Sequence, residues 1–419
     1  MSTAVTKGVI LVGGPSKGTR MRPLSLDCAK PLLPIAGKPM VWHPLAALAK
    51  VPGLTEILII GFYEDSVMSG FIKDAKREFP NIGISYLREY RPLGTAGGLY
   101  HFRDSILRPP VPQNIFICNI DICSSWPLTE MMELHGKHRG VGTILGVNVK
   151  KETATNYGCI VSDPSSSLVL HYVEKPESWI SNMVNGGVYL FDKSLFDEIK
   201  VAMDDKAARA AEDPLLQLQS DEILQLEQDV IVPLAAAKKM YVYETNDFWR
   251  QIKTAASAVT ASRLYLNRFK TIAPELLASS SAVIIPPSYI DPSAIIDPTA
   301  KIGPNVAIGP GVRIGEGVRV KDAIVMEGST IERHACVLNS IVGNNCQVGP
   351  WARVEGEPEP EQDTKGKISV TVLATEVTLA PETLVRSCIV LPNVSPPGGE
   401  QQLTGQKSLS KNSANQVLL

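Results

Sequence analysis

A six-residue period in the last third of the chain limits its fold more than any other feature. Counting every sixth residue from position 300 reaches ten small or β-branched residues in succession: Ala300, Val306, Val312, Val318, Ile324, Thr330, Cys336, Val342, Val348 and Val354. One inward-facing position every six residues, with Gly or Pro in the turns, is typical of a β-helix whose coils bury one another. Such helices are usually left-handed, against the usual crossover rule. We therefore expect a left-handed parallel β-helix of hexapeptide repeats at residues 290–395.

The repeat is interrupted at residues 355–367 and resumes at Val372, Thr378, Leu384 and Val390. The insert is acidic, broken by prolines and free of apolar anchors, so it is expected to project into solvent. A flexible loop and a loop that contacts a partner both remain open. Residues 396–419 form a polar C-terminal tail.

Residues 1–270 show a different pattern, in which short apolar runs alternate with helical periods. We expect strands at 9–12, 56–60, 84–87, 114–118 and 143–149 and helices at 41–50, 66–79 and 129–137. Such alternation predicts a Rossmann-like α/β domain with a mixed, mostly parallel sheet covered by helices. Residues 271–289 are the expected linker to the β-helix. A length of 419 residues agrees with two domains.

Charge and cysteine content exclude several kinds of protein. A formal net charge of -2 gives no electrostatic reason to expect nucleic acid or an anionic membrane as a partner. The seven cysteines have no CxxC spacing, which favours reduced thiols over disulfides or zinc. The start of the chain lacks the features of a signal peptide, and no apolar run is long enough to span a membrane. We expect a cytoplasmic protein.

The first candidate site is the loop that follows the strand at 9–12. Gly13 and Gly14 let backbone N–H groups approach an anion, and Arg20 and Lys30 are among the cations that follow. The spacing fits neither a P-loop nor a dinucleotide-binding motif. An ordinary strand-to-helix turn also favours glycine, but the cations indicate the phosphates of a nucleotide.

Further candidates follow the other expected strands. Glu89 precedes a small-residue loop, starting at Gly94, that opens a helix; exposed N–H groups there and the carboxylate could hold a guanine base. Asn119 and Asp121 end the strand near residue 115, where Asp121 could bind Mg²⁺ or be a solvated aspartate. The polar positions that could hold a sugar and its phosphate are Gly158, Glu174, Lys175 and Asn185.

Taken together, the motifs GTRMRPL with KPL, PLGTAGG, NID, YG, VEKP and NGG, followed by the hexapeptide repeat, resemble the sugar-1-phosphate nucleotidyltransferases. The resemblance is greatest to the GDP-mannose pyrophosphorylases, or mannose-1-phosphate guanylyltransferases, and covers nearly the whole chain. It implies a reaction in which mannose-1-phosphate attacks the α-phosphorus of GTP and diphosphate leaves, with Mg²⁺ bridging the phosphates.

Two departures from the catalytic pattern weaken that expectation. The opening loop is two residues longer than in the family and contains Pro15, which has no N–H; this should displace Arg20. Gln251 stands where the family's W-x-D motif has its second metal carboxylate. Arg20 and Lys30 are then only candidates for a vestigial catalytic role. Asp121 becomes a weak or lost Mg²⁺ ligand, and no tightly bound cofactor is expected: Mg²⁺ would accompany a nucleotide without being organised for catalysis.

In both departures the chain resembles the regulatory alpha subunits of that family. This implies a chain that binds GDP-mannose, with Gln251 among its contacts, and mediates feedback inhibition of a catalytic beta subunit in a homo- and hetero-oligomer. The 355–367 insert is the expected element that blocks or distorts the partner's active site. Two alternatives stay open: an active guanylyltransferase, which retains Asp121, Lys30 and Lys175, and a subunit of the translation-initiation exchange factor, which has the same two-domain architecture.

Overall fold

The chain forms two compact units in the computed structural model, which describes residues 4–14, 19–212, 223–358, 368–395 and 402–404. The first unit comprises Met1–Lys17 and Val41–Trp249, and the second comprises Gly18–Met40 and Arg250–Leu419. This division differs from the boundary expected at residue 270 and assigns a segment near the N-terminus to the unit that holds the β-helix.

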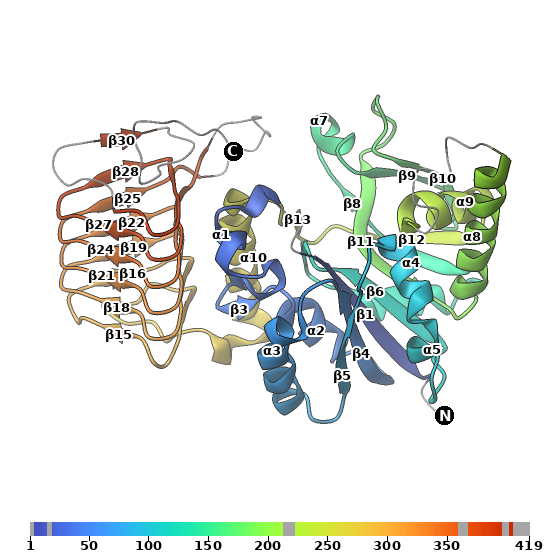
Figure 1. Ribbon diagram of the computed structural model, residues 1–419, viewed down its shortest axis with the longest axis horizontal. Coiled ribbons are helices and arrows are strands. Elements are labelled where there is room, and N and C mark those ends of the chain that lie inside the picture. The colour runs from blue at the N-terminus through green and yellow to red at the C-terminus, as the bar shows by residue number, and fades with distance from the viewer. Residues whose placement is uncertain (1–3, 15–18, 213–222, 359–367, 396–401, 405–419) are drawn as a thin grey trace. The chain divides into compact units, whose positions relative to one another are not determined.

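The first unit is built on a nine-stranded mixed sheet (Figure 1). Its centre, β6-β1-β4-β5, is parallel, whereas β11 runs antiparallel to β6 and β8. Most residues of β1 are buried, as in strands covered on both faces. The strands are β1 (Thr6–Gly13), β4 (Leu54–Gly61), β5 (Gly83–Arg88), β6 (Asn114–Asn119), β8 (Gly142–Asn148), β9 (Gly158–Ser162), β10 (Val169–Glu174), β11 (Met183–Phe191) and β12 (Met240–Thr245); β7 (Ile122–Ser124) lies outside this sheet.

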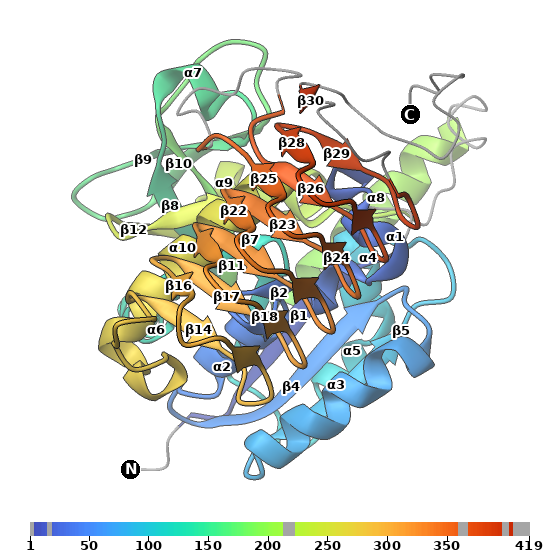
Figure 2. The same cartoon turned by 90° about the vertical axis from the view of Figure 1, so that its left-hand side faces the viewer.

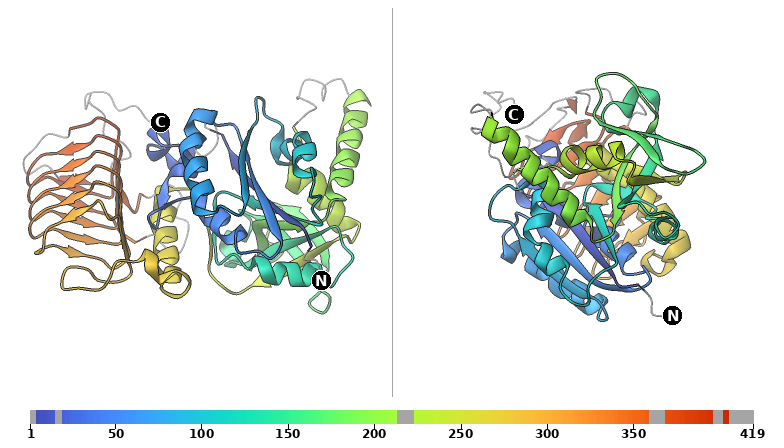
Figure 3. Two further views of the ribbon diagram at one scale, coloured as in Figure 1. Left: turned by 90° about the horizontal axis from the view of Figure 1, so that it is seen from below. Right: turned by 90° about the vertical axis from the view of Figure 1, so that its right-hand side faces the viewer.

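Helices lie on either side of this sheet (Figure 3). They are α2 (Trp42–Leu48), α3 (Asp65–Glu78), α4 (Gly94–His101), α5 (Arg103–Ile106), α6 (Leu128–His135), α7 (Lys151–Ala154), α8 (Leu195–Glu212), the π-helix η4 (Leu226–Ile231) and α9 (Val232–Ala236). All the strands and helices predicted for this region are confirmed, with ends that differ by at most three residues. In the described part of the chain, no helix is long and apolar enough to cross a bilayer.

The second unit contains a parallel β-helix whose short strands stack coil upon coil (Figures 1 and 2). It has three all-parallel sheets, the arrangement of a left-handed β-helix, and confirms the predicted fold. The first sheet is β14 (Ser288–Ile290), β17 (Val306–Ile308), β20 (Ala323–Val325), β23 (Ser340–Val342), β26 (Thr371–Leu373) and β29 (Ile389–Val390). The second is β15 (Ile295–Ile296), β18 (Arg313–Ile314), β21 (Thr330–Ile331), β24 (Gln347–Val348) and β27 (Thr378–Leu379). The third is β16 (Lys301–Ile302), β19 (Arg319–Lys321), β22 (Cys336–Leu338), β25 (Arg353–Glu355), β28 (Leu384–Arg386) and β30 (Gln402–Thr404).

The predicted register of the repeat is wrong in its middle part. Val306 pairs with Ala323 and Ile324 with Ile341, so two successive coils take 17 residues each rather than 18. Counting by six therefore slips out of the small-residue column at Ile324, Thr330 and Cys336. From Val342 onward the count by six falls on the neighbouring aliphatic column. That column runs Ile302, Ile308, Ile314, Val320, Val325, Ile331, Val337, Val342, Val348 and Val354. Thr330 and Cys336 are only half-buried, whereas Ile331 and Val337 lie fully inside.

The predicted insert and tail are described only in part. Strand β25 ends at Glu355 and β26 resumes at Thr371, while residues 359–367 lie outside the described ranges, so the projecting loop stays a prediction. Within the expected polar tail, β30 pairs in parallel with β28. The seven cysteines are all free thiols, as predicted.

Helix α10 (Ala255–Ile272) packs on the first sheet of the β-helix. Thr254 and Ser257 form a capping box at its start. The segment from the N-terminal part of the chain lies on the same helix, since the Ala36 N–H donates to Ser262 Oγ at 3.1 Å. A Cβ at Gly37 would lie 2.1 Å from the Tyr289 ring. The elements of this segment are η1 (Thr19–Met21), α1 (Leu24–Asp27), η2 (Lys30–Leu32), β2 (Pro34–Ile35) and β3 (Lys38–Pro39); η5 (Pro274–Leu276) follows α10, and β13 (Trp249–Gln251) spans the unit boundary.

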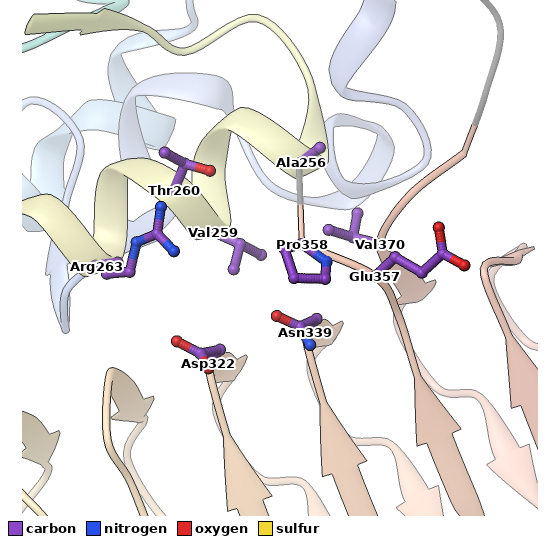
Figure 4. A pocket seen from close by; sticks show the side chains of 9 residues that line it. All are labelled: Ala256, Val259, Thr260, Arg263, Asp322, Asn339, Glu357, Pro358 and Val370. Atoms are coloured by element: carbon purple, nitrogen blue, oxygen red, sulfur yellow. The ribbon is translucent and has the colours of Figure 1, made fainter. Parts of the chain in front are cut away.

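A small hollow lies between α10 and one corner of the β-helix (Figure 4). Thr260 and Arg263 line it from the helix, and Asp322 and Asn339 line it from successive coils. Asp322 and Asn339 both have left-handed backbone, with φ of 47° and 44°, which Asn and Asp tolerate better than most residues. These side chains therefore belong to the corner column of the coils.

Candidate functional site

The opening loop begins where the sequence predicted it. Gly13 ends β1 with φ +64°, and a Cβ at Gly14 would lie 2.5 Å from Phe62 Cβ. Both positions therefore require glycine for reasons of backbone and packing. Residues 15–18 lie outside the described ranges, so the phosphate cradle itself stays a prediction.

Three of the predicted site residues belong to the second unit. Arg20 is exposed in η1, and Lys30 is half-buried at the start of η2. Gln251 is half-buried at the end of β13. The remaining predicted residues all lie in the first unit.

Asn119 and Asp121 lie at the carboxyl edge of the parallel sheet. Asn119 is the last residue of β6 and is paired with Leu11 of β1, and Asp121 follows two residues later. The carboxyl ends of parallel strands are where ligands of such sheets bind. Among the residues that the structure describes, no group of three or more His, Cys, Asp or Glu could hold a metal ion. A weak or lost Mg²⁺ site at Asp121 stays a prediction.

Glu89 is a buried carboxylate beside α4. It follows β5, its N–H donates to the Gly61 carbonyl at 2.8 Å, and only 8% of the residue is exposed. Burial raises the pKa of its carboxyl to about 7. A Cβ at Gly98 would lie 2.1 Å from Glu89 Oε1, so this glycine of α4 makes room for the carboxylate.

The expectation of exposed N–H groups at the start of α4 is wrong for two of them. The N–H groups of Ala96 and Gly97 donate to the Leu224 carbonyl at 3.0 and 3.3 Å. Leu224 N–H donates in turn to the Leu93 carbonyl at 2.8 Å. A Cβ at Gly94 would lie 2.3 Å from the Leu224 carbonyl oxygen, so Gly94 serves this packing contact. A segment about 130 residues away caps the helix.

The predicted sugar-binding residues come together at the ends of β9, β10 and β11. Glu174 Oε1 lies 3.0 Å from Lys175 Nζ, and Glu174 Oε2 accepts a hydrogen bond from the Tyr172 hydroxyl at 2.8 Å. The Glu174 side chain is 14% exposed and that of Lys175 64%. A Cβ at Gly158 would lie 2.1 Å from the Tyr172 hydroxyl, so Gly158 leaves space for this pair. The result is an ion pair with its lysine facing solvent.

Asn185 connects this ion pair to residues that sequence reasoning missed. Its Nδ2 donates to the hydroxyls of Tyr172 and Tyr189 at 3.0 and 2.9 Å, and the Tyr189 hydroxyl donates to Glu227 Oε1 at 3.1 Å. Strand alternation could have revealed Tyr172, two residues before Glu174, and Tyr189, four after Asn185. Glu227 lies in a segment where the sequence pattern predicted no helix or strand.

An aromatic pair packs beside β11, next to Asn185. The Trp249 indole N–H donates to the Gly186 carbonyl at 3.0 Å, and Tyr157 meets the Trp249 ring edge-on with 5.4 Å between ring centroids. The first unit thus offers a buried acceptor, Glu89, and a polar network around Glu174 and Asn185. These groups can accept hydrogen bonds from a base and from sugar hydroxyls.

Two family profiles together match most of the chain. The nucleotidyl transferase family matches residues 7–267, and the GMPPB C-terminal domain family matches residues 284–395. A Bacillus anthracis crystal structure, named "Putative Glucose-1-Phosphate Thymidylyltransferase", shares the fold with a TM-score of 0.51 at 21% identity. It covers 62% of this chain and 95% of that one.

Two relatives are similar over nearly their full length. A Schizosaccharomyces pombe protein named "Probable mannose-1-phosphate guanyltransferase" is 44% identical over 93% of this chain and 97% of its own. The human "Mannose-1-phosphate guanylyltransferase regulatory subunit alpha" is 44% identical over 99% of this chain and 100% of its own. The chain therefore belongs to the nucleotidyl transferase family, among the mannose-1-phosphate guanylyltransferases and their regulatory alpha subunits.

Proposed function

We propose that this chain is a catalytically deficient regulatory subunit that binds GDP-mannose and restrains a catalytic beta subunit in a hetero-oligomer. The observation that carries the proposal is Gln251, a neutral amide at the position where the resemblance to the catalytic W-x-D motif implies a second metal carboxylate. An amide oxygen carries no charge, so Gln251 is a poor substitute for a carboxylate ligand of a catalytic Mg²⁺. A loss of about 4 kcal/mol in transition-state stabilisation slows a reaction roughly a thousandfold.

The polar groups of the first unit support ligand binding without turnover. Glu89 is an acceptor suited to the adjacent N1–H and N2–H donors of guanine. Glu174 and Lys175 present a carboxylate and an ammonium that can bind sugar hydroxyls and a phosphate. Neither contact requires an organised metal. Feedback control follows if GDP-mannose binds one of two conformational states more tightly than the other.

Calorimetry and a turnover assay on the full chain test the proposal. We expect the purified chain to bind GDP-mannose and to form GDP-mannose from GTP and mannose-1-phosphate with Mg²⁺ at most at a trace rate. Turnover at an ordinary enzymatic rate without a partner would overturn it. Absence of GDP-mannose binding would remove its basis and would be the result expected of an exchange-factor subunit.

An active guanylyltransferase is the second candidate, favoured by the retained Asp121, Lys30 and Lys175. The substitution Gln251→Asp separates the two. An active enzyme should change little in rate, whereas a deficient one that regains a carboxylate should gain activity. Gln251→Asn is the matched control, because it alters length without adding charge.

A further inference from the structure

The Asn185 side chain has its orientation set by its neighbours. The Gly187 N–H can only donate, and it lies 2.8 Å from Oδ1, so the carbonyl end of the amide faces Gly187. Nδ2 therefore faces the two tyrosine hydroxyls, and its two hydrogens are both used there. Asn185 can offer a ligand only the remaining lone pair of Oδ1.

Each tyrosine hydroxyl can then donate one hydrogen bond. Because it accepts from Asn185, its own hydrogen is available for a carboxylate: Tyr172 donates to Glu174 at 2.8 Å and Tyr189 to Glu227 at 3.1 Å. Tyr189 is fully buried and Tyr172 nearly so. Burial raises the pKa of both phenols, so both keep their protons. The network is a fork with a carboxylate at each end.

The two carboxylates differ in what they can reach. Glu174 is paired with the exposed Lys175, at the surface where a sugar would lie. Glu227 is half-buried on η4, and its second oxygen lies 3.5 Å from the Thr95 hydroxyl, which accepts the Leu226 N–H at 2.8 Å. Burial also raises the pKa of Glu227. Glu227 thus joins Tyr189 to the first turn of α4.

We propose that Tyr189 and Glu227 are positioning residues for recognition of the sugar: they hold Asn185, and through it Tyr172 and the Glu174 carboxylate, in the orientation that binds the hexose of a nucleoside-diphosphate sugar. The proposal rests on the proposed binding of GDP-mannose. Neither residue needs to touch the ligand. Their loss frees Asn185 to rotate and leaves the Tyr172–Glu174 pair held from one side only.

The test compares GDP-mannose with GDP, which lacks the sugar, by calorimetry on the full chain. The ratio of the two dissociation constants, Kd(GDP)/Kd(GDP-mannose), measures the contribution of the hexose. We expect Tyr189→Phe to lower this ratio about three- to tenfold, the range for loss of one or two buried hydrogen bonds. The Kd for GDP itself should stay within about twofold of the wild type.

Glu227 offers a matched pair of variants. Glu227→Leu removes the acceptor and should lower the ratio as Tyr189→Phe does. Glu227→Gln should retain most of it, because its amide oxygen can still accept from Tyr189 and its N–H can donate to Thr95. Combining Tyr189→Phe with Glu227→Leu should add little, since both remove the same arm of the fork. Tyr243→Phe, on β12 outside the network, is the control.

The outcomes separate the two proposals. A wild-type chain that does not bind GDP-mannose defeats the proposed function. If it binds, the positioning role is overturned by an unchanged ratio in both Tyr189→Phe and Glu227→Leu. Equal weakening of GDP and GDP-mannose also overturns it, since that indicates general damage to the fold. Thermal unfolding of each variant shows whether it is folded at the temperature of the titration.

Discussion

The proposed binding of GDP-mannose should depend on pH through Glu89. A guanine base is held by an ionised carboxylate that accepts its N1–H and N2–H, whereas a protonated carboxyl repels one of these donors. Burial raises the pKa of Glu89 from 4.5 to about 7, so in the free protein the carboxyl is about half protonated at neutral pH. Binding must therefore expel a proton as the pH falls.

The size of the effect follows from that pKa. If bound guanine keeps Glu89 ionised, the apparent Kd rises with the fraction of protonated carboxyl. It should be about tenfold weaker at pH 6 than at pH 8. GDP-mannose suits this measurement because its diphosphate, esterified at both ends, does not titrate in that range. Glu89→Gln should bind weakly at both pH values and lose the pH dependence.

The same burial affects stability, with the opposite sign. A carboxyl whose pKa is raised on folding stabilises the fold below pH 4.5 and loses that contribution as the pH rises through 7. At pH 8 the ionised Glu89 should cost up to about 3 kcal/mol. Glu89→Gln should therefore unfold at a higher temperature than the wild type at pH 8, and the difference should shrink at pH 4.

Calorimetric titration at pH 6, 7 and 8 measures the first effect and thermal unfolding at pH 4 and 8 the second. Glu133→Gln, at an exposed glutamate of α6, is the control for loss of a carboxylate. A Kd for the wild type that changes less than twofold between pH 6 and 8 would refute the reasoning. So would a Glu89→Gln variant that keeps the wild-type pH dependence.

Three further predictions concern packing and titration. Ile331→Ala should lower the free energy of unfolding by about 2 to 4 kcal/mol in denaturant titrations. Thr330→Ala should change it by less than about 1 kcal/mol, because only Ile331 lies inside the coil. Similar losses in the two variants would contradict the corrected register. Gly37→Ala should cost about 2 to 3 kcal/mol, since φ is +82° and the new Cβ would meet the Tyr289 ring; a Tm equal to that of the wild type would contradict this contact. Burial, with His135 nearby, lowers the pKa of His138 from 6.5 to about 4, so the stability of the fold should fall as the pH drops from 6.5 through 4. The His138→Gln variant should lose less stability than the wild type over that range. Equal pH dependence of the two proteins in thermal unfolding would refute this role of His138.

Local patterns predicted the elements well but the coil register poorly. The strand at 9–12 and the helix at 66–79 follow from their own residues, and the structure has them as β1 and α3. In the β-helix, small and β-branched residues occupy both inward columns. A side shortened by one residue, as between Val320 and Val325, therefore leaves no mark in a count by six. Only the pairing of coils reveals the shift.

The candidate site likewise contains residues that the sequence predicted and contacts that it did not. Glu174, Lys175 and Asn185 carry recognisable motifs, and the structure brings them together. The capping of α4 by Leu224 and the bond from Tyr189 to Glu227 join residues far apart in the chain. Such contacts depend on the tertiary fold, because nothing in the sequence near residue 225 indicates which helix it meets.

The composition of the second unit limits how this protein can be recombined with its relatives. Gly37 packs against Tyr289, and the Ala36 N–H is hydrogen-bonded to Ser262. A stretch of about twenty residues near the start of the chain is therefore complementary to α10 and to the first coil. A chimera joined once, near residue 270, would combine the 18–40 segment and most of α10 with a foreign coil. Exchanging the β-helix intact requires residues 18–40 and 250–419 to be transferred as one set.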